Sequence, residues 1–271
     1  MRFTVLGAGG FIGSQLLAAL RADGHECFAP DRGDTRVFAA NLGHAVYCIG
    51  LTADFRSRPF DTIRAHIGVL AEILERARFD SLLYLSSTRV YARAIDGEED
   101  TLIPVNPSDA SDYYNLTKLT AEALCFVSGR DSVRVARLSN VYGLDFGSEN
   151  FLARVIRDAI GTGRVVLETA LESAKDYVAL EDVVDLLPRI ATEGDARLYN
   201  VASGCNLTNR ELAQALARTT GCRAEATPGA PIFRFPAISI ERVRREFGFH
   251  PRSLVEDLGP LVARYREETK A

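Results

Sequence analysis

The sequence predicts an α/β protein built on a doubly wound parallel sheet, with a smaller C-terminal lobe. Three observations predict this fold. Short apolar runs alternate with segments of helical periodicity up to about residue 142, a glycine-rich turn joins the first run to the first helix, and the pattern beyond residue 142 is less regular. Alternation of strands and helices is typical of a parallel sheet covered on both faces. No internal repeat or long linker separates the lobes, so we expect the second lobe to consist of segments that leave the sheet and return.

The N-terminal part is expected to supply most of the sheet. Its strands are short apolar runs bounded by turn residues, and its helices carry apolar residues at intervals of three and four. In chain order the strands are expected at residues 2–6, 26–30, 45–49, 81–85 and 133–138, and the helices at residues 11–20, 63–78 and 113–126.

The C-terminal part alternates less regularly. Thr208 is followed three residues later by Glu211, a spacing that forms a capping box at a helix start. Strands are expected at residues 165–167 and 198–201, and helices at residues 149–160, 178–190, 208–217 and 240–247.

Composition and charge limit the kinds of partner. The chain of 271 residues is 47% apolar and has a formal net charge of −4, so it lacks the basic field that attracts nucleic acid polymers. Its five cysteines are scattered without a CxxC pair, which argues against a metal centre and for free thiols in a reducing compartment. No apolar run is long enough to span a membrane, and no leader precedes the first strand. We therefore expect a soluble cytoplasmic protein.

The glycine-rich turn predicts a Rossmann-like dinucleotide site. The segment GAGGFIG starts at Gly7 and lies between the first strand and the first helix. Glycines there permit a tight turn and let the backbone approach a pyrophosphate, whose charge the helix N-terminus favours. The spacing is GxxGxxG, a variant of the GxGxxG fingerprint. The residues expected to contact the cofactor are Gly7, Gly10, Phe11, Ile12 and Gly13.

The end of the second strand bears on the choice of cofactor. Asp31 lies 18 positions after Gly13, close to the spacing of a carboxylate that accepts hydrogen bonds from the adenosine ribose, which favours NAD. Arg32 and Arg36 leave NADP open, because a guanidinium beside the ribose accommodates a 2′-phosphate. The alternative is that all three residues are solvated loop charges.

Two residues of SDYYNLTK, which starts at Ser111, are candidates for acid–base chemistry. Tyr114 and Lys118 are four residues apart on an expected helix and therefore share a face. A lysine ammonium lowers the pKa of a phenol from about 10 toward working pH. Such a tyrosine can take a proton from a sugar hydroxyl while hydride leaves the same carbon. Tyr113 would have Thr117 as its neighbour, which supplies no charge.

A third catalytic side chain is expected at the end of a neighbouring strand. Ser86, Ser87 and Thr88 follow the expected strand 81–85. Parallel sheets bind their ligands at the carboxyl ends of the strands, which places these hydroxyls near the site. Spacing alone does not choose among them.

Seven short motifs follow one another along nearly the whole chain. They are GAGGFIGS at Gly7, SSTRVY at Ser86, YNLTK at Tyr114, RLSNVYG at Arg137, KDYVALEDVV at Lys175, YNVASG at Tyr199 and RREFGFHPR at Arg244. In this order and spacing the sequence resembles the extended short-chain dehydrogenase/reductases, the group of NAD-dependent epimerases and dehydratases that act on nucleotide sugars.

The resemblance implies roles for individual residues. It selects Ser87 as the catalytic hydroxyl, four residues before the tyrosine of the VY pair, with Tyr114 as the acid/base. Lys118 then lowers the pKa of the tyrosine and holds the nicotinamide ribose. Gly50 and Leu138 are expected to border the cofactor, and the expected substrate-binding residues are Thr88, Asn140, Lys175 and Arg234.

The sequence departs from the family pattern in the sheet. Only 13 residues separate Asp31 from the strand at Ala45, too few for a helix, a further strand and their connections. We therefore predict a sheet that lacks one outer strand, ordered 2-1-4-5-6-7 in family terms. The residues that normally enclose the adenine would be missing with it.

Three further departures concern the surroundings of the site. His66 stands where relatives usually have asparagine, and we interpret it as a partly buried structural histidine. Thr88 and Arg89 replace the acidic pair of sugar 4,6-dehydratases, so loss of water from the sugar is not expected. The charged loop Leu51–Arg58 borders the site without an assigned role.

The sequence thus predicts an NAD(P)-dependent nucleotide-sugar epimerase that works by transient oxidation at a sugar hydroxyl carbon. A nucleotide-sugar 4-ketoreductase or dehydrogenase would use the same residues, and a non-catalytic redox sensor that binds the dinucleotide is the alternative from another class. Residues 1–141 are expected to form the dinucleotide-binding core, with 176–203 returning to it. Residues 142–175 and 204–271 are expected to form mainly the substrate lobe, and the family implies a homodimer.

Overall fold

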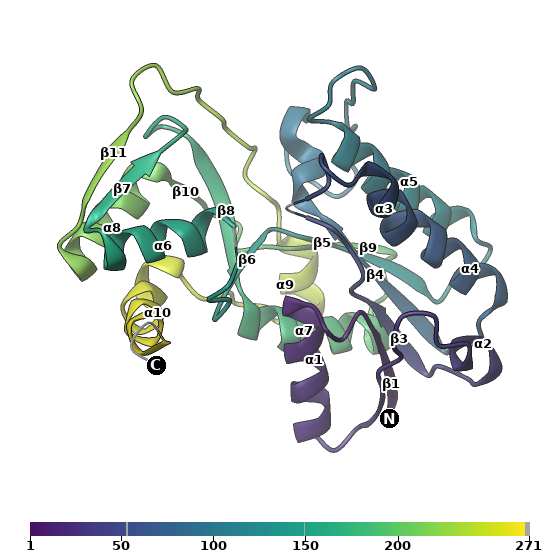
Figure 1. Ribbon diagram of the computed structural model, residues 1–271. Helices are drawn as coiled ribbons and strands as arrows, with labels where there is room; N and C mark the ends of the chain where they lie inside the picture. Colours follow the sequence, from purple (N-terminus) through teal and green to yellow (C-terminus); the bar gives the residue numbers. More distant parts are fainter. Residues whose placement is uncertain (53, 149, 269–271) are drawn as a thin grey trace.

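The centre of the computed structural model, which describes residues 1–52, 54–148 and 150–268, is a six-stranded sheet. Its order is β2-β1-β3-β4-β5-β9, and every neighbouring pair is parallel (Figure 1). The predicted fold class is therefore confirmed. The strands are β1 (Arg2–Leu6), β2 (Glu26–Phe28), β3 (His44–Tyr47), β4 (Ser81–Ser87), β5 (Val133–Leu138) and β9 (Leu198–Val201).

Helices cover both faces of this sheet, because successive strand residues point to opposite sides and both sides are apolar. On one face α1 (Phe11–Ala22), α7 (Leu180–Glu193) and α9 (Glu241–Phe247) pack with Val5 and Leu83. On the other face α4 (Val69–Arg76) and α5 (Tyr113–Val127) pack with Leu82 and Tyr84. In the described part of the chain, no helix combines the length and apolar character needed to cross a membrane.

The predicted loss of an outer strand is also confirmed. Between β2 and β3 the chain forms only α2 (Arg36–Ala39), and β2 lies at the edge of the sheet. A parallel strand would need a crossover of a dozen or more residues in addition to its own length. The segment is too short for both, so β1 pairs directly with β3.

A second group of elements lies beside the sheet (Figure 1). The strand β8 (Ala174–Ala179) pairs antiparallel with β10 (Asn206–Thr208) and parallel with β6 (Asn140–Tyr142). A separate parallel pair is formed by β7 (Arg164–Leu167) and β11 (Arg223–Ala226). The helices α6 (Phe151–Gly161), α8 (Asn209–Thr220) and α10 (Leu254–Glu268) pack around a separate apolar core. The predicted capping box is present, since Thr208 and Glu211 exchange hydrogen bonds at the start of α8.

Several boundaries differ from the sequence expectation. The expected helix 63–78 is divided into α3 (Pro59–Ile63), a π-helix η1 (Arg64–Gly68) and α4. The expected start of α6, residue 149, lies outside the described residues. The helix α10 was not among the expected elements, and it contains Pro260.

A buried ion pair attaches α5 to the sheet. Arg137 of β5 and Glu122 of α5 are 4% and 2% exposed, and their charged atoms are 2.6 Å apart. Ser86 of β4 donates a hydrogen bond to the same carboxylate. The Arg137 guanidinium also donates to the Tyr91 hydroxyl at 2.7 Å, which in turn donates to Asn200 of β9 at 2.8 Å. The network therefore joins α5 to three neighbouring strands.

A buried histidine in the π-helix attaches the segment after β3. His66 is fully buried, and its Nε2 accepts a hydrogen bond from the Leu51 N–H at 3.2 Å. The Thr117 hydroxyl, 2.8 Å from His66 Nδ1, donates its own hydrogen to the Tyr114 carbonyl. Nδ1 must therefore carry the proton, and the ring is neutral. Burial, followed by the charge of Lys118, lowers the His66 pKa to about 3.

We predict that Glu122→Gln lowers the free energy of unfolding by about 3–5 kcal/mol, because it leaves the Arg137 charge buried without a counter-ion. Urea denaturation measures the change. The matched control is Glu225→Gln, which breaks an ion pair with Arg164. The Glu225 side chain in this pair is 58% exposed. That control should cost less than about 1 kcal/mol. Equal losses in the two variants would contradict the structural role of the buried pair.

We also predict that His66 makes the fold sensitive to acid. Its pKa is 6.5 in the unfolded chain and about 3 in the folded protein, so the unfolded chain takes up a proton first as the pH falls. Stability is therefore lost with acidification, by about 2 kcal/mol between about pH 7 and pH 5 from this group alone. Urea unfolding of His66→Asn at both pH values should show a pH dependence reduced by that amount. The exposed His250→Asn is the control, and an unchanged pH dependence in His66→Asn would refute the assignment.

Candidate active site

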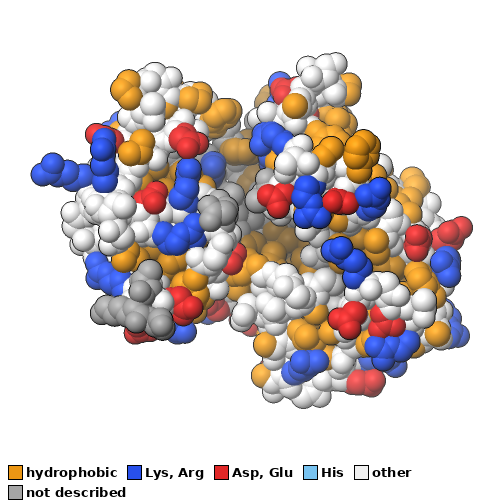
Figure 2. All heavy atoms as spheres, in the orientation of Figure 1, with side chains coloured by type: hydrophobic (Ala, Val, Ile, Leu, Met, Phe, Trp, Pro, Cys, Tyr) orange, Lys and Arg blue, Asp and Glu red, His pale blue; other side chains and the backbone are white. Residues whose placement is uncertain are grey.

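The sequence-predicted catalytic residues meet at the carboxyl ends of the central strands. Ser87 is the last residue of β4 and lies in register with Leu138, the last residue of β5. Tyr114 is in the first turn of α5, and Lys118 follows it one turn later. Figure 2 shows the molecule hollowed between the two groups of elements, with Lys and Arg side chains on both sides of the hollow.

Ser87 is oriented by the helix that follows it. It caps the 3-10 helix η2 (Thr88–Arg93), and its Oγ accepts a hydrogen bond from the Arg89 N–H at 3.2 Å. The backbone thus occupies a lone pair of the hydroxyl and leaves its hydrogen available. A serine held in this way can donate a hydrogen bond to a substrate oxygen.

Tyr114 is almost completely buried, at 4% exposed. Its ring packs against Phe55 and against the edge of His66, with centroids 5.3 and 5.4 Å away. Burial raises the pKa of its phenol, while hydrogen bonding with Ser87, the charge of Arg89 and hydrogen bonding with Thr52 lower it. Burial has the largest effect, so the pKa of the phenol stays above its ordinary value, and the neighbouring groups oppose only part of the increase.

Lys118 lies one helical turn after Tyr114 on the same face of α5. Its Nζ donates a hydrogen bond to the Leu85 carbonyl at 2.9 Å and is 5.9 Å from the centre of the Tyr114 ring. Burial lowers its pKa to about 8, so the amine still carries a proton at neutral pH. Tyr113 turns away, because its hydroxyl donates to the Pro59 carbonyl at 2.5 Å. Only one of the two adjacent tyrosines is therefore placed for chemistry.

The glycine turn has the shape of a phosphate cradle. Gly7 has φ +88°, and a Cβ there would lie 3.0 Å from the Cys48 carbonyl carbon. A Cβ on Gly13 would lie 2.3 Å from the Gly7 oxygen, so α1 can approach the turn only with glycine there. Gly10 is the N-cap of α1, which begins at Phe11 and Ile12 and leaves backbone N–H groups without partners in the helix. These residues fit a dinucleotide pyrophosphate.

The other expected cofactor residues lie along the same edge. Asp31 and Arg32 are exposed just beyond β2, and Arg36 forms an ion pair with Asp34 at 2.6 Å, so its guanidinium is already engaged. Gly50 follows β3, and a Cβ on it would be 3.7 Å from Lys118 Nζ. A larger residue there would crowd the catalytic lysine.

The expected substrate residues lie on both sides of the hollow. Thr88 is buried in η2 beside Ser87. The Asn140 amide donates to the Asp176 carbonyl at 2.7 Å, which fixes it between β6 and β8. Lys175 lies over the Phe151 ring at 4.7 Å, and a backbone bridge to Ala174 places Arg234 beside it. The structure therefore brings Lys175 and Arg234 to neighbouring positions.

Sequence reasoning missed three residues that contact the catalytic tyrosine. They are Thr52 and Phe55 from the charged loop and Arg89 from η2. For the loop, the signal available in the sequence was its place after β3. The strands β3 and β4 are parallel neighbours, so the loop leaves β3 at the same end of the sheet at which β4 ends in Ser87. A loop that starts there must pass the site.

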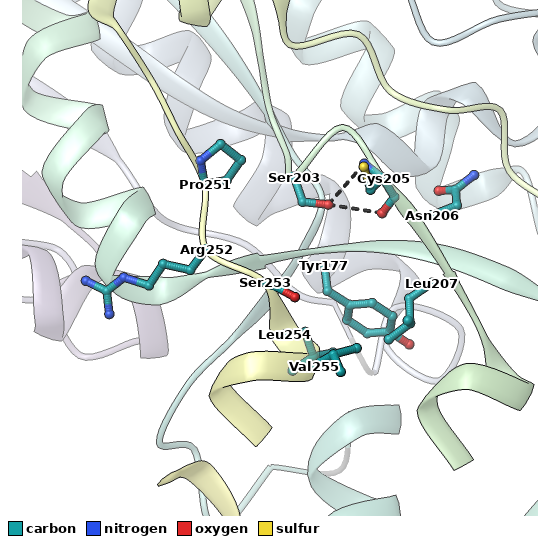
Figure 3. Close-up of a pocket in the computed structure, with 10 residues that line it drawn as sticks. All are labelled: Tyr177, Ser203, Cys205, Asn206, Leu207, Pro251, Arg252, Ser253, Leu254 and Val255. Atoms are coloured by element: carbon teal, nitrogen blue, oxygen red, sulfur yellow. Dashed lines mark hydrogen bonds between the residues drawn. The ribbon is translucent and has the colours of Figure 1, made fainter. Parts of the chain in front are cut away.

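A separate cavity of about 220 Å³ lies below β8, lined by Tyr177, Cys205 and Arg252 among others (Figure 3). Ser203 hydrogen-bonds with the backbone of Cys205 at its rim. None of the expected site residues lines it, and its volume is small for a nucleotide sugar. The cavity is therefore distinct from the catalytic residues.

Two relatives illustrate the similarity in sequence. A dTDP-glucose 4,6-dehydratase from Streptomyces griseus is 29% identical over 201 residues, which cover 69% of this chain and 59% of that protein, less than two thirds of its length. A UDP-glucose 4-epimerase from Mycolicibacterium smegmatis is 27% identical over an alignment of 319 residues that covers 100% of both chains.

The fold is shared with solved structures. MoeE5, determined in complex with UDP-glucuronic acid and NAD, matches with a TM-score of 0.83 and 22% identity over 99% of this chain and 100% of that chain. Residues 3–202 match the model of the NAD dependent epimerase/dehydratase family. The match includes the glycine turn, Ser87, Tyr114 and Lys118. The chain belongs to the NAD-dependent epimerase/dehydratase family.

Proposed function

We propose that the protein is an NAD-dependent nucleotide-sugar epimerase that oxidises a sugar hydroxyl carbon transiently. The observation that supports this most strongly is the setting of Tyr114, a buried phenol flanked by the Ser87 hydroxyl and by the charges of Lys118 and Arg89. That setting suits proton removal from an alcohol. The bare glycine turn lies at the same edge of the sheet.

The protein's own residues would move one proton in each direction. Ser87 donates a hydrogen bond to the reacting sugar oxygen while the Tyr114 phenolate removes its proton. Lys118 stabilises the phenolate through its charge. When the keto sugar has turned, Tyr114 returns the proton to the same oxygen. A 4-ketoreductase or dehydrogenase would share the first half of this sequence.

The cofactor is assigned to the turn and to the strand ends around it. Gly7, Gly10, Phe11, Ile12 and Gly13 would hold the pyrophosphate, Asp31 the adenosine ribose and Lys118 the nicotinamide ribose, with Gly50 and Leu138 alongside. NAD, when bound, supplies a nicotinamide carbon that accepts and returns a hydride.

We assign the two ends of the substrate, the anionic diphosphate and the polar sugar, to different residues. Lys175, Arg234 and Asn140 would bind the diphosphate from one side of the hollow, and Ser87, Thr88 and Tyr114 would bind the sugar. The relatives support a nucleotide sugar, since their names refer to dTDP-glucose and UDP-glucose and MoeE5 holds UDP-glucuronic acid.

Epimerisation is favoured over loss of water by the residues after Ser87. Elimination from a sugar needs an acid and a base beside the carbons that lose water. Thr88 has a hydroxyl of ordinary acidity, and Arg89 is a cation, so neither supplies a carboxyl group there. Oxidation by Tyr114 needs neither.

The remaining parts of the proposal concern the domains, the cellular compartment and the oligomeric state. We assign residues 1–141 and 176–203 to the dinucleotide-binding core and 142–175 and 204–271 to the substrate lobe. All five cysteines are free, which supports a reducing cytoplasm. A homodimer is supported by exposed apolar side chains on the outer helices, at Phe60, Ile63 and Val69.

We predict that Tyr114→Phe lowers kcat by about 10²–10⁴-fold, because it removes the acid/base group. Turnover is followed by chromatography and NMR with a panel of nucleotide sugars. The matched control is Tyr113→Phe, which loses one hydrogen bond to Pro59 and should change kcat less than about fivefold. Unchanged turnover in Tyr114→Phe would remove this residue from the mechanism. Absence of turnover of any sugar by the wild type would favour the redox sensor.

We predict that the charge of Lys118 sets the pH dependence of turnover. Removing a cation beside a phenol raises the phenol pKa, so Lys118→Met should move the acidic limb of the kcat profile to higher pH by about one unit or more. Lys118→Arg keeps the charge and should leave the limb near its wild-type position. Profiles that coincide in all three proteins would show that Lys118 acts only in binding.

A further inference from the structure

The charged loop Leu51–Arg58 covers the catalytic tyrosine. It is tied at its start by the Leu51 N–H bond to His66 and beyond its end by the Tyr113 bond to the Pro59 carbonyl. Between these ties Phe55 is buried against the Tyr114 ring, although the residues around it are exposed. Phe55 therefore forms a wall of the site beside Tyr114.

Two arginines stack on this wall. The guanidinium carbons of Arg56 and Arg89 lie 4.5 and 5.3 Å from the centre of the Phe55 ring. The Arg89 guanidinium is also 5.5 Å from the centre of the Tyr114 ring, and it donates one hydrogen bond to the Ser111 carbonyl at 3.0 Å. Stacking and this bond hold the group beside the reacting residue.

The charge of Arg89 is not neutralised by the protein. Among the described residues, Arg56, Arg89 and Lys175 form no ion pair. The carboxylates that face Arg89, Asp109 and Asp112, are engaged by Arg93, which reaches Asp112 at 2.9 Å. Burial and the charge of Arg56 lower the Arg89 pKa.

Such an arrangement costs free energy unless a ligand supplies the counter-ion. A planar guanidinium with free N–H groups binds a carboxylate through two parallel hydrogen bonds. The diphosphate is assigned to Lys175, Arg234 and Asn140, on the side of β6 and β8. The charge of Arg89 also acts on Lys175, whose pKa is lowered by burial and then by this charge, but the Arg89 guanidinium lies over the Tyr114 ring, where the proposed reaction places the sugar carbon.

We propose that Arg89, supported by Arg56, binds a carboxylate on the sugar ring, so that the substrate is a nucleotide-activated hexuronic acid. This inference rests on the proposed function, since it takes Tyr114 as the group that meets the sugar. It also gives the charged loop a role: Phe55 positions both guanidinium groups on the sugar side of the site.

The test compares UDP-glucuronic acid with UDP-glucose, which differ only in a carboxylate or a hydroxymethyl group at the same carbon. The wild type should have the higher kcat/KM for the uronic acid. Arg89→Gln should lower the ratio of the two kcat/KM values by about 100-fold, the effect of one charge-assisted pair. Arg89→Lys, which keeps the charge without the planar group, should recover about tenfold of that loss.

The control for charge alone is Arg64→Gln, since Arg64 is exposed and pairs with Asp61. It should leave the ratio unchanged. A ratio in Arg89→Gln equal to that of the wild type, in a variant with wild-type melting temperature, would overturn the inference while the epimerase proposal stands. The same comparison is made with the thymidine diphosphate sugars.

A readout independent of turnover separates the two proposals. If no nucleotide sugar of the panel is turned over, the proposed function fails, and calorimetric binding of UDP-glucuronic acid and its thymidine counterpart then tests Arg89 alone. Binding that weakens about 100-fold in Arg89→Gln supports the carboxylate site. Absence of binding to the wild type, or equal binding to both proteins, overturns it.

Discussion

The position of α5, which carries Tyr114 and Lys118, depends on one buried ion pair. Tyr114, Lys118 and Glu122 are spaced by four residues and therefore form one stripe along α5. The last of them is held by Arg137 of β5 and by Ser86 of β4, next to Ser87. The contact that fixes Glu122 against the sheet thus also fixes where the phenol and the amine stand relative to the serine. A shift of α5 along the sheet would leave one of these charges buried without its partner, which is strongly unfavourable.

The same helix face creates an electrostatic problem for the proposed mechanism, since it buries the phenol that we propose as the acid/base group. Burial raises the Tyr114 pKa, and only nearby charges and hydrogen bonds oppose it. Two cations on different elements lie near the ring, and the charge of Arg89 is among the effects that lower the Tyr114 pKa. Lys118 approaches from below on α5, while Arg89 approaches from η2 after Ser87. The attachment of α5 to β4 brings the two cations together, because Lys118 lies on α5 and Arg89 lies on η2, which directly follows β4.

Short-range signals in the sequence predicted the sheet and the meeting of Ser87, Tyr114 and Lys118 at the carboxyl ends of its strands. Apolar runs, the glycine spacing, the interval between Tyr114 and Lys118, and the short connection after Asp31 each report on local geometry. The loop over the site could not be derived in this way. Phe55 is buried by contacts with residues far along the chain, and nothing in its own neighbourhood distinguishes it from an exposed aromatic residue. The division of the helix at His66 likewise depends on Leu51 and Thr117, which are distant in sequence.

The trimmed sheet and the charged loop affect opposite ends of the site. With α2 alone between β2 and β3, Asp31 lies exposed at an edge strand, so few side chains can enclose the adenosine end of a dinucleotide. The cofactor must then be held mainly by the glycine turn and the residues near Lys118. At the sugar end the chain instead adds contacts, since the loop after β3 brings Phe55 to Tyr114 and Arg56 to Phe55, while η2 brings Arg89 to both rings. If Tyr114 meets the sugar as proposed, these contacts surround the reacting carbon, where binding interactions can act on the transition state.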